Sequence, residues 1–427
     1  MKFRVSLPRI ILLVLLTAVV TVLGVNVFSG SDNKIKLSFP HEYDVANPQF
    51  LRSMSVLLGP ALVQGNRTET LLNGDEIFPA MLKAIREAKK TITFETYIYW
   101  SGAIGKEFAD ALAERARNGV KVHILLDWVG SQKMEEALLQ EMREAGVKIE
   151  KYHPLRWYTL DRLNNRTHRK LLVADGRIGF TGGVGIADEW SGHAQDEGHW
   201  RDTHYRVEGP VVAQMQAAFV DNWTKVSGLV LHGEDYFPAL APVGPHYGQV
   251  FKSSVDGGAE SMHLMYLLSI AASARSIDLA MAYFVPDRLA LDALEAALKR
   301  GVKVRIVMPG NKTDASLVRR ASRATWGRIL RAGAEMYEYQ PTMYHCKVFV
   351  VDGLWTSVGS TNFDSRSFRL NDEANLNIYD REFAQRQRVD FEADLRKSRR
   401  ITVEEWENRP ATEKAWEHFL GLFGSQL

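Results

Sequence analysis

HRKLLVAD at residues 168–175 is repeated later in the chain as HCKVFVVD at residues 345–352, and both copies fit the pattern H-x-K-x-x-x-x-D. A glycine-rich turn follows each copy at the same offset, GGVG at residues 182–185 and GSTN at residues 359–362. One short match of this kind carries little information. Two copies with matched turns predict two related halves whose equivalent sites meet.

The residue types of the motif indicate chemistry on an anion. His168 and Lys170, like His345 and Lys347, are two positions apart, so on an extended strand they point to the same face. The apolar run after each pair predicts a buried strand that would hold the imidazole and the ammonium group rigidly. Two such strands brought together would surround one point with two histidines and two lysines, which favours a phosphate.

A pair of histidines can divide the work of phosphoryl transfer. One imidazole can attack phosphorus while the other, protonated, gives its proton to the leaving alcohol. Histidine suits both roles because its pKa lies near neutral pH. Asn362, in the second glycine-rich turn, could add an amide donor to the phosphate. This mechanism needs no metal ion, and no cluster of Cys and His has metal-site spacing, so we expect no cofactor.

The aspartates that end the two motifs, Asp175 and Asp352, have two interpretations. They could orient catalytic groups, as the motif pattern suggests. They could also end the strand in a turn, because each is followed by glycine and Asp-Gly is a strong turn signal. The sequence leaves both interpretations open.

The similarity between the halves extends beyond the motif. AKKTITFETY at residues 88–97 resembles ARSIDLAMAY at 274–283, and NGVKV at 118–122 corresponds to RGVKV at 300–304, with a helical pattern between them in each half. The order strand, helix, strand and motif strand predicts an α/β fold of two fused repeats. We expect pseudo-twofold symmetry and mostly parallel sheets flanked by helices.

The N-terminal segment has the pattern of a membrane anchor. Lys2, Arg4 and Arg9 precede an apolar run at residues 10–28, close to the ~20 residues that span a bilayer. Positive residues before the run predict a cytoplasmic N-terminus, with the rest of the chain across the membrane. A cleaved signal peptide is the alternative, but the run is long and no clear cleavage site follows. We expect one N-terminal transmembrane helix in the cell's inner membrane, with the catalytic part on the non-cytoplasmic side.

These patterns give a domain plan. We expect the membrane anchor at residues 1–29, a linker at 30–70, the first repeat at 71–230 and the second repeat at 249–427. A segment rich in Gly, Pro and His, residues 228–248, separates the repeats. The second repeat ends in a helical tail at 415–423, which could dock on the domain or lie at the membrane surface.

The composition is that of a globular protein with a balanced charge. Hydrophobic residues make up 46% and charged residues 24%, and the formal net charge is +2. A protein that binds nucleic acid duplexes more often has a strong basic excess, so this balance favours a lipid over a nucleic acid as partner. The single cysteine, Cys346, permits no disulfide within this sequence and is interpreted as a small apolar core residue.

The doubled motif resembles the phospholipase D superfamily, and its flanks are similar to the bacterial cardiolipin synthase branch. These flanks are NRTHRK at 165–170, WRDTH at 200–204, EGP at 208–210 and YQP at 339–341. The resemblance covers the chain from about residue 70 to the C-terminus. It implies a set of site residues, with His168 as nucleophile, His345 as general acid, Lys170, Lys347, Ser360 and Asn362 at the phosphate, and Asp202 and Glu373 supporting the histidines.

One feature departs from that family pattern. The second turn keeps the family's Gly-Ser-x-Asn form, but in the first turn the two polar positions are Gly183 and Gly185. A symmetric phosphate cradle is therefore not expected, whereas the His/Lys core is complete.

The resemblance implies a phosphatidyltransferase that makes cardiolipin from phosphatidylglycerol through a phosphohistidine intermediate. The close alternative is hydrolysis of a phospholipid by the same residues, with water as acceptor, and a nuclease is less favoured. A non-enzymatic lipid-binding relic of the fold is disfavoured because both His/Lys pairs are present. No motif encodes the choice of acceptor. A phospholipid and a membrane are the expected partners, without nucleic acid.

Overall fold

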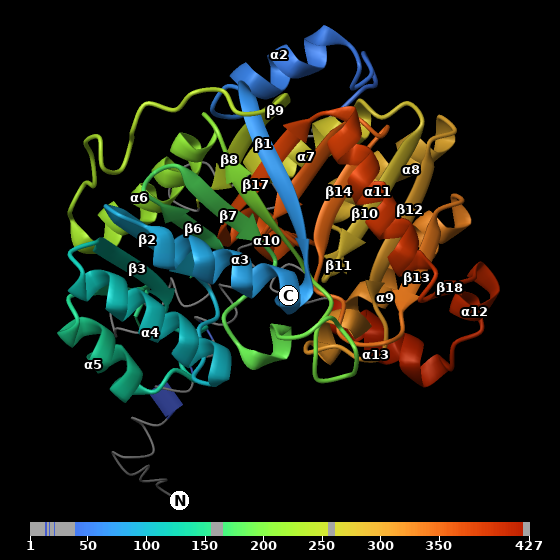
Figure 1. Ribbon diagram of the computed structural model, residues 1–427. Helices are drawn as coiled ribbons and strands as arrows, with labels where there is room; N and C mark the ends of the chain where they lie inside the picture. Colours follow the sequence, from blue (N-terminus) through green and yellow to red (C-terminus); the bar gives the residue numbers. More distant parts are fainter. Residues whose placement is uncertain are drawn as a thin grey trace, which may run out of the picture.

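The structure is a computed structural model that describes residues 39–154, 165–254 and 261–421, together with four isolated residues near the N-terminus (Figure 1). Apart from those four, the expected anchor at residues 1–29 lies outside the described residues. Within the described residues, no helix has the length and apolar character needed to cross a membrane.

Two repeats with the same strand order make up the described structure. The strands of the first are β1 (Val63–Leu72), β2 (Thr91–Thr96), β3 (Lys121–Asp127), β4 (Lys148–Tyr152), β6 (Leu171–Ala174), β7 (Ile178–Gly182) and β8 (Thr203–Glu208). The strands of the second are β9 (His246–Ser253), β10 (Ser276–Met281), β12 (Lys303–Pro309), β13 (Glu335–Tyr339), β14 (Lys347–Val351), β15 (Trp355–Gly359) and β17 (Asn371–Tyr379). They run in the orders β4-β3-β2-β6-β7-β8-β1 and β13-β12-β10-β14-β15-β17-β9. The prediction of two fused α/β repeats is confirmed.

The two sheets join edge to edge. β1 pairs with β9, so the strands of both repeats form one continuous sheet, which Figure 1 shows from the first repeat in blue and green to the second in orange and red. One strand extends it at the side: β18 (Ser398–Ile401) runs antiparallel to β13. The short strands β11 (Phe284–Val285) and β16 (Phe363–Asp364) form a separate two-stranded sheet.

The prediction of mostly parallel sheets is wrong. Among the seven strands listed for each repeat, only β2-β3-β4 and β10-β12-β13 are parallel to their neighbours, and the other pairs within these sets are antiparallel. The reason lies in the Asp-Gly turns after the motif strands. Asp175 and Asp352 both have φ +53°, which makes the turn tight and returns the chain directly as a hairpin. A parallel connection would need a crossover of a dozen or more residues.

Helices cover both faces of the sheet. In chain order they are α2 (Pro48–Leu57), α3 (Asn73–Glu87), α4 (Ala103–Arg117), α5 (Glu136–Glu144), the 3-10 turn η2 (Asp188–Trp190), α6 (Val212–Ser227), α7 (Ser261–Ala271), α8 (Arg288–Lys299), α9 (Ser316–Arg331), α10 (Ser365–Arg369), α11 (Arg381–Leu395), α12 (Val403–Glu407) and α13 (Ala411–Gly421). α3, α4 and α5 bury the outer core of the first repeat, as α7, α8 and α9 do in the second. α6 and α11 share a third core that lies between the repeats.

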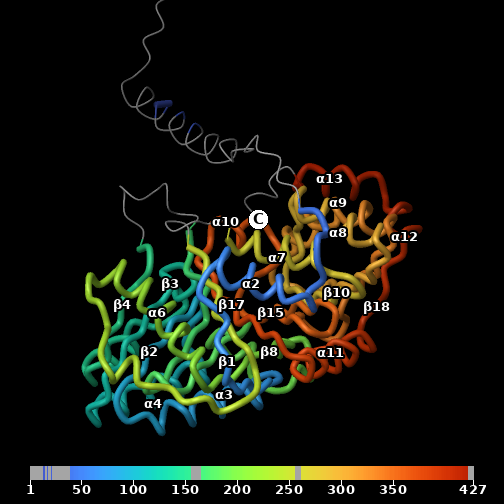
Figure 2. Tube along the Cα trace, turned by 90° about the horizontal axis from the view of Figure 1, so that it is seen from above, coloured from blue at the N-terminus to red at the C-terminus, as the bar shows by residue number. Residues whose placement is uncertain are grey.

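The N-terminal helix α2 and the C-terminal helix α13 both pack on the second repeat. Helix α2 and most of β1 fall within the segment expected as a linker, and Phe50 of α2 packs edge-on against Trp355, with 5.1 Å between the ring centroids. Seen from above in Figure 2, α2 lies beside α7, whose buried residues share its core. The C-terminal helix α13 docks on α9, where the buried Glu417 forms an ion pair with Arg323 at 3.2 Å. The described part of the tail thus has the docked arrangement.

Candidate active site

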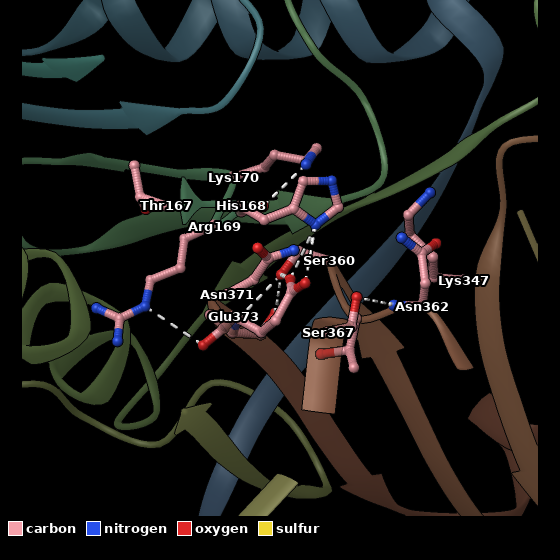
Figure 3. Close-up of polar contacts among 12 residues, drawn as sticks. Thr167, His168, Arg169, Lys170, Lys347, Ser360, Asn362, Ser367, Asn371 and Glu373 are labelled. Carbon is pink, nitrogen blue, oxygen red and sulfur yellow. Dashed lines mark hydrogen bonds and ion pairs between the residues drawn. The ribbon is translucent and has the colours of Figure 1, made fainter. Parts of the chain in front are cut away.

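Each motif histidine contacts a carboxylate from the other repeat. His168 Nδ1 lies 3.0 Å from both carboxylate oxygens of Glu373 on β17, as Figure 3 shows. His345 Nδ1 lies 2.7 Å from Oδ2 of Asp202, which directly precedes β8. All four side chains are buried. A carboxylate at Nδ1 favours the tautomer that carries its proton there, which leaves the lone pair on Nε2. In His345 that Nε2 also lies 3.3 Å from Lys347 Nζ.

Backbone pairing between the repeats brings these groups together. β5 (Arg166–Thr167) runs parallel to β17, and the His168 N–H donates to the carbonyl of Asp372 at 2.8 Å. The equivalent contact in the other half has the same length, from the His345 N–H to the carbonyl of Arg201. The chain that enters each motif therefore pairs with the last strand region of the opposite repeat. This exchange is the pseudo-twofold relation that the duplicated motif predicts.

The motif lysines lie beneath the histidines. Lys170 Nζ donates to the His168 carbonyl at 2.8 Å, and Lys347 Nζ donates to the His345 carbonyl at 2.7 Å. Burial and the neighbouring Lys347 lower the pKa of Lys170 to about 7, and burial lowers the pKa of Lys347. Two buried ammonium groups that repel each other form a site that an anion would stabilise.

The charges of the site balance when both histidines are neutral. Burial lowers the pKa of His168 to about 4 against the attraction of Glu373, and burial and Lys347 lower the pKa of His345. Burial alone would raise the pKa values of Asp202 and Glu373, but the histidines and lysines hold them below their ordinary range. Two carboxylates then offset two ammonium groups. Among the described residues, no group of three or more His, Cys, Asp and Glu is placed to hold a metal ion.

Aromatic rings surround the histidines. The ring of Tyr97 lies edge-on to His168, with 5.2 Å between centroids, and the rings of Trp190 and Trp200 lie 5.3 and 5.6 Å from that of His345. The sequence did not predict a role for Trp190. The duplicated pattern marks residues that occur in both halves, and a residue that serves only one half carries no such signal.

The second glycine-rich turn holds both polar residues expected at the phosphate. The Ser360 hydroxyl donates to Glu373 Oε2 at 2.5 Å and accepts from the Ala374 N–H at 3.0 Å, so Ser360 contacts the supporting carboxylate (Figure 3). Asn362 is buried, and its N–H donates to the Ser367 hydroxyl at 3.2 Å. Its side-chain oxygen has no hydrogen-bond partner among the described residues.

Asp175 and Asp352 lie at the opposite ends of their strands from the histidines. The Asp175 carboxylate accepts from the backbone N–H groups of residues 89, 90 and 91, at 2.7–3.1 Å. Asp352 accepts in the same way from residues 274, 275 and 276, at 2.7–2.9 Å. Each carboxylate therefore joins the turn of its motif hairpin to the start of the neighbouring strand, which is β2 in the first repeat and β10 in the second. These contacts agree with the second interpretation of Asp175 and Asp352, in which each aspartate ends its strand in a turn.

Two histidines, each oriented by a carboxylate and flanked by a lysine at the junction of two α/β repeats, make up a site of the phospholipase D type. The family model described as "Cardiolipin synthase, PLD-like domain" matches residues 81–223 and 266–395. Among curated proteins, cardiolipin synthase 2 of Bacillus anthracis is 38% identical over 345 residues, covering 80% of this chain and 67% of that protein. The chain therefore belongs to the cardiolipin synthase family of PLD-like proteins.

Further relatives agree with this assignment. The major cardiolipin synthase ClsA of Bacillus subtilis is 37% identical over 350 residues, covering 81% of this chain and 72% of that protein. Among solved structures, the phosphatidylserine synthase of Haemophilus influenzae superposes with a TM-score of 0.67 over 84% of this chain and 95% of the other. At 14% identity, that likeness bears on the fold alone.

Asp352→Ala should reduce stability and leave the chemistry intact. The substitution removes three hydrogen bonds from backbone N–H groups to a buried carboxylate, so we expect a loss of about 2–4 kcal/mol in the free energy of unfolding. Turnover per folded molecule should stay within a few-fold of wild type. Urea unfolding and activity at low temperature would measure both quantities. Asp110→Ala, at an exposed helix position, is the control and should change neither. Lost turnover at unchanged stability would instead support a catalytic role.

Proposed function

We propose that this protein is a phosphatidyltransferase that forms cardiolipin and glycerol from two molecules of phosphatidylglycerol. The observation that carries the proposal is the pair of crossed contacts, His168 with Glu373 and His345 with Asp202. They orient two imidazoles beside two buried lysines, and Lys347 Nζ lies 3.3 Å from His345 Nε2. The relatives whose names state cardiolipin synthesis support the choice of lipid product.

In the first step His168 Nε2 attacks the phosphorus of one phosphatidylglycerol. The bond from phosphorus to the headgroup glycerol oxygen breaks, and His345 gives its Nε2 proton to that oxygen, so glycerol leaves as a neutral alcohol. The phosphatidyl group stays on His168 as a phosphohistidine. Glu373 stabilises the positive charge that develops on the His168 ring.

The charge balance of the site supports this proton arrangement. Before substrate binds, the site is neutral when both imidazoles are unprotonated and both lysines are protonated, because Asp202 and Glu373 then offset Lys170 and Lys347. A phosphodiester brings one negative charge. One proton on His345 restores neutrality, and its attraction to the phosphate opposes the burial that lowers the His345 pKa. Substrate binding thus prepares the general acid.

In the second step the roles reverse. His345 takes the proton from a glycerol hydroxyl of the second phosphatidylglycerol, whose oxygen attacks phosphorus and displaces His168. Lys170, Lys347 and the Asn362 amide stabilise the charged phosphoryl oxygens in both steps. Because the two histidines are buried among aromatic rings, water has little access to the phosphohistidine, which favours an alcohol as acceptor.

Vesicles of phosphatidylglycerol would test the reaction. The detergent-purified protein should convert them to cardiolipin and glycerol. We expect His168→Ala to abolish turnover and His345→Ala to reduce it roughly 10²–10⁴-fold, the usual contribution of a general acid. His193→Ala, at an exposed position, is the matched control and should keep wild-type activity. Phosphatidic acid as the main product would replace transfer with hydrolysis, and an active His168→Ala variant would contradict the two-histidine mechanism.

The order of action can be read from a trapped intermediate. An activated aryl phosphodiester needs little protonation of its leaving group, so His345→Asn should still form the phosphohistidine but lack the base that activates the acceptor. We expect an acid-labile adduct on His168 in that variant and none in His168→Asn, measured by mass spectrometry after rapid quenching. An adduct on His345 in the His168 variant would reverse the two roles.

We further propose that the apolar run at residues 10–28 anchors the protein in the cell's inner membrane, with the folded part on the non-cytoplasmic side. The three basic residues before the run and the lipid substrate support this proposal. Protease added outside spheroplasts should therefore digest the folded part of the full-length chain. A cytoplasmic protein of the same cells is the control for lysis. Full protection in intact spheroplasts, with digestion only after lysis, would contradict the proposed orientation.

A further inference from the structure

The two carboxylates that hold the histidines obtain their second hydrogen bond in different ways. In the second half, Glu373 accepts from the hydroxyl of Ser360, which belongs to the glycine-rich turn. Gly183 occupies the equivalent position in the first half, since Gly183 N–H bonds to the Thr203 carbonyl as Ser360 N–H bonds to that of Ala374. A Cβ at Gly183 would lie 2.2 Å from Asp202 Oδ1, so a side chain there would displace the Asp202 carboxylate from its present position.

Trp190 fills the place of the missing donor. Its indole N–H donates to Asp202 Oδ2 at 2.9 Å, the same oxygen that contacts His345 Nδ1 at 2.7 Å. The other oxygen, Oδ1, accepts from the Thr203 backbone N–H at 2.8 Å. The Trp190 side chain is buried, lies edge-on to the His345 ring and packs on Trp200 with 4.5 Å between centroids. It comes from η2, an element separate from the motif and from its turn.

We propose that Trp190 is a positioning residue that, through Asp202, fixes the orientation of His345 and limits its proton affinity. The inference rests on the proposed function in one respect only, that His345 transfers the proton. The geometry of the Trp190–Asp202–His345 relay holds whatever the substrate is.

The chemistry of the donor explains the asymmetry. An indole N–H can only donate, so it stabilises Asp202 as the ionised carboxylate and draws part of the negative charge away from the imidazole. Ser360 both donates and accepts, since its oxygen also receives the Ala374 N–H. The Ser360 hydroxyl can therefore reorient the hydrogen that it donates to Glu373. The Trp190 indole N–H, in contrast, donates to Asp202 in one fixed direction. His345 is thus held with a proton on Nδ1 and uses Nε2 for transfer.

Other charged groups act on the same pair and must stay constant in a test. Lys347 on β14 contacts both ring nitrogens of His345, at 3.1 and 3.3 Å. The other groups that interact with Asp202 or His345 are Lys170 just before β6, His204 on β8, Cys346 just before β14 and Asp314 before α9. A variant at Trp190 changes none of them, so a change in the titration of His345 reports the loss of the indole contact.

Trp190→Phe keeps an aromatic ring and removes the N–H. Without the indole N–H, the Asp202 carboxylate is more basic and holds the His345 proton more strongly. We therefore expect the midpoint of the His345 titration to rise by about one pH unit, the size expected for one lost hydrogen bond to a charged group. The basic limb of the kcat profile should move in the same direction, with a several-fold lower maximum. Nitrogen-15 NMR of histidine-labelled full-length protein in detergent would follow His345, identified by comparison with His345→Asn.

Two further variants separate the relay from packing. Trp355→Phe is the matched control, because Trp355 is also buried but its indole N–H has no partner among the described residues, and its His345 titration should equal wild type. Ser360→Ala should shift His168 and leave His345 unchanged. Replacing Trp190 by benzothienylalanine, which keeps the ring shape without the N–H, gives the same test should Trp190→Phe fail to fold.

An unchanged His345 titration in the folded Trp190 variants would overturn the inference, as would an equal shift in Trp355→Phe. The NMR titration does not depend on turnover. If the protein is inactive on phosphatidylglycerol but the shift is present, the role of Trp190 stands and the proposed function is wrong. If cardiolipin forms but the shift is absent, the proposed function stands and the role of Trp190 is wrong.

Discussion

The structure depends on an exchange of charged partners between two similar halves. Glu373 from the second repeat is buried against His168 of the first, and Asp202 from the first is buried against His345 of the second. Removing one member of such a pair leaves a buried polar group without its hydrogen-bond partner, which typically costs about 1–3 kcal/mol and more for a charged group. The repeats therefore cannot separate without exposing both sites.

The residue between His and Lys in the first motif, Arg169, strengthens the same junction. Arg169 is fully buried and donates to the carbonyls of Ala218 at 2.7 Å and Ser253 at 2.8 Å, the second of which belongs to the other repeat. On the opposite side Arg201, whose carbonyl receives the His345 N–H, holds Asp394 of α11 with two hydrogen bonds at 3.0 and 2.9 Å. In the first motif, His168 and Lys170 thus face the site while Arg169 joins the halves.

Features that are local and duplicated could be predicted from the sequence. The motif strands, the histidines and lysines and the two-repeat plan follow from short patterns that occur twice, and the Asp-Gly turns were recognised as a possible role for Asp175 and Asp352. The direction of the strands was not predicted correctly, because an apolar run indicates burial on both faces and gives no information on its neighbour's direction. The crossed pairing of histidines with carboxylates and the contact of Trp190 depend on long-range packing, which leaves no periodic signal.

The crossed contacts also affect how substitutions can accumulate in such a chain. Two identical copies of one repeat could make the same exchange across a symmetric interface, but every substitution would then appear in both halves at once. Within one chain, each half varies alone. The first turn has Gly183, so Asp202 receives its hydrogen bond from Trp190 of η2, whereas the second turn supplies Ser360 to Glu373. The two carboxylates therefore differ in their surroundings while the fold around them keeps its symmetry. Because both repeats belong to one chain, the two halves of the active site can take on different roles.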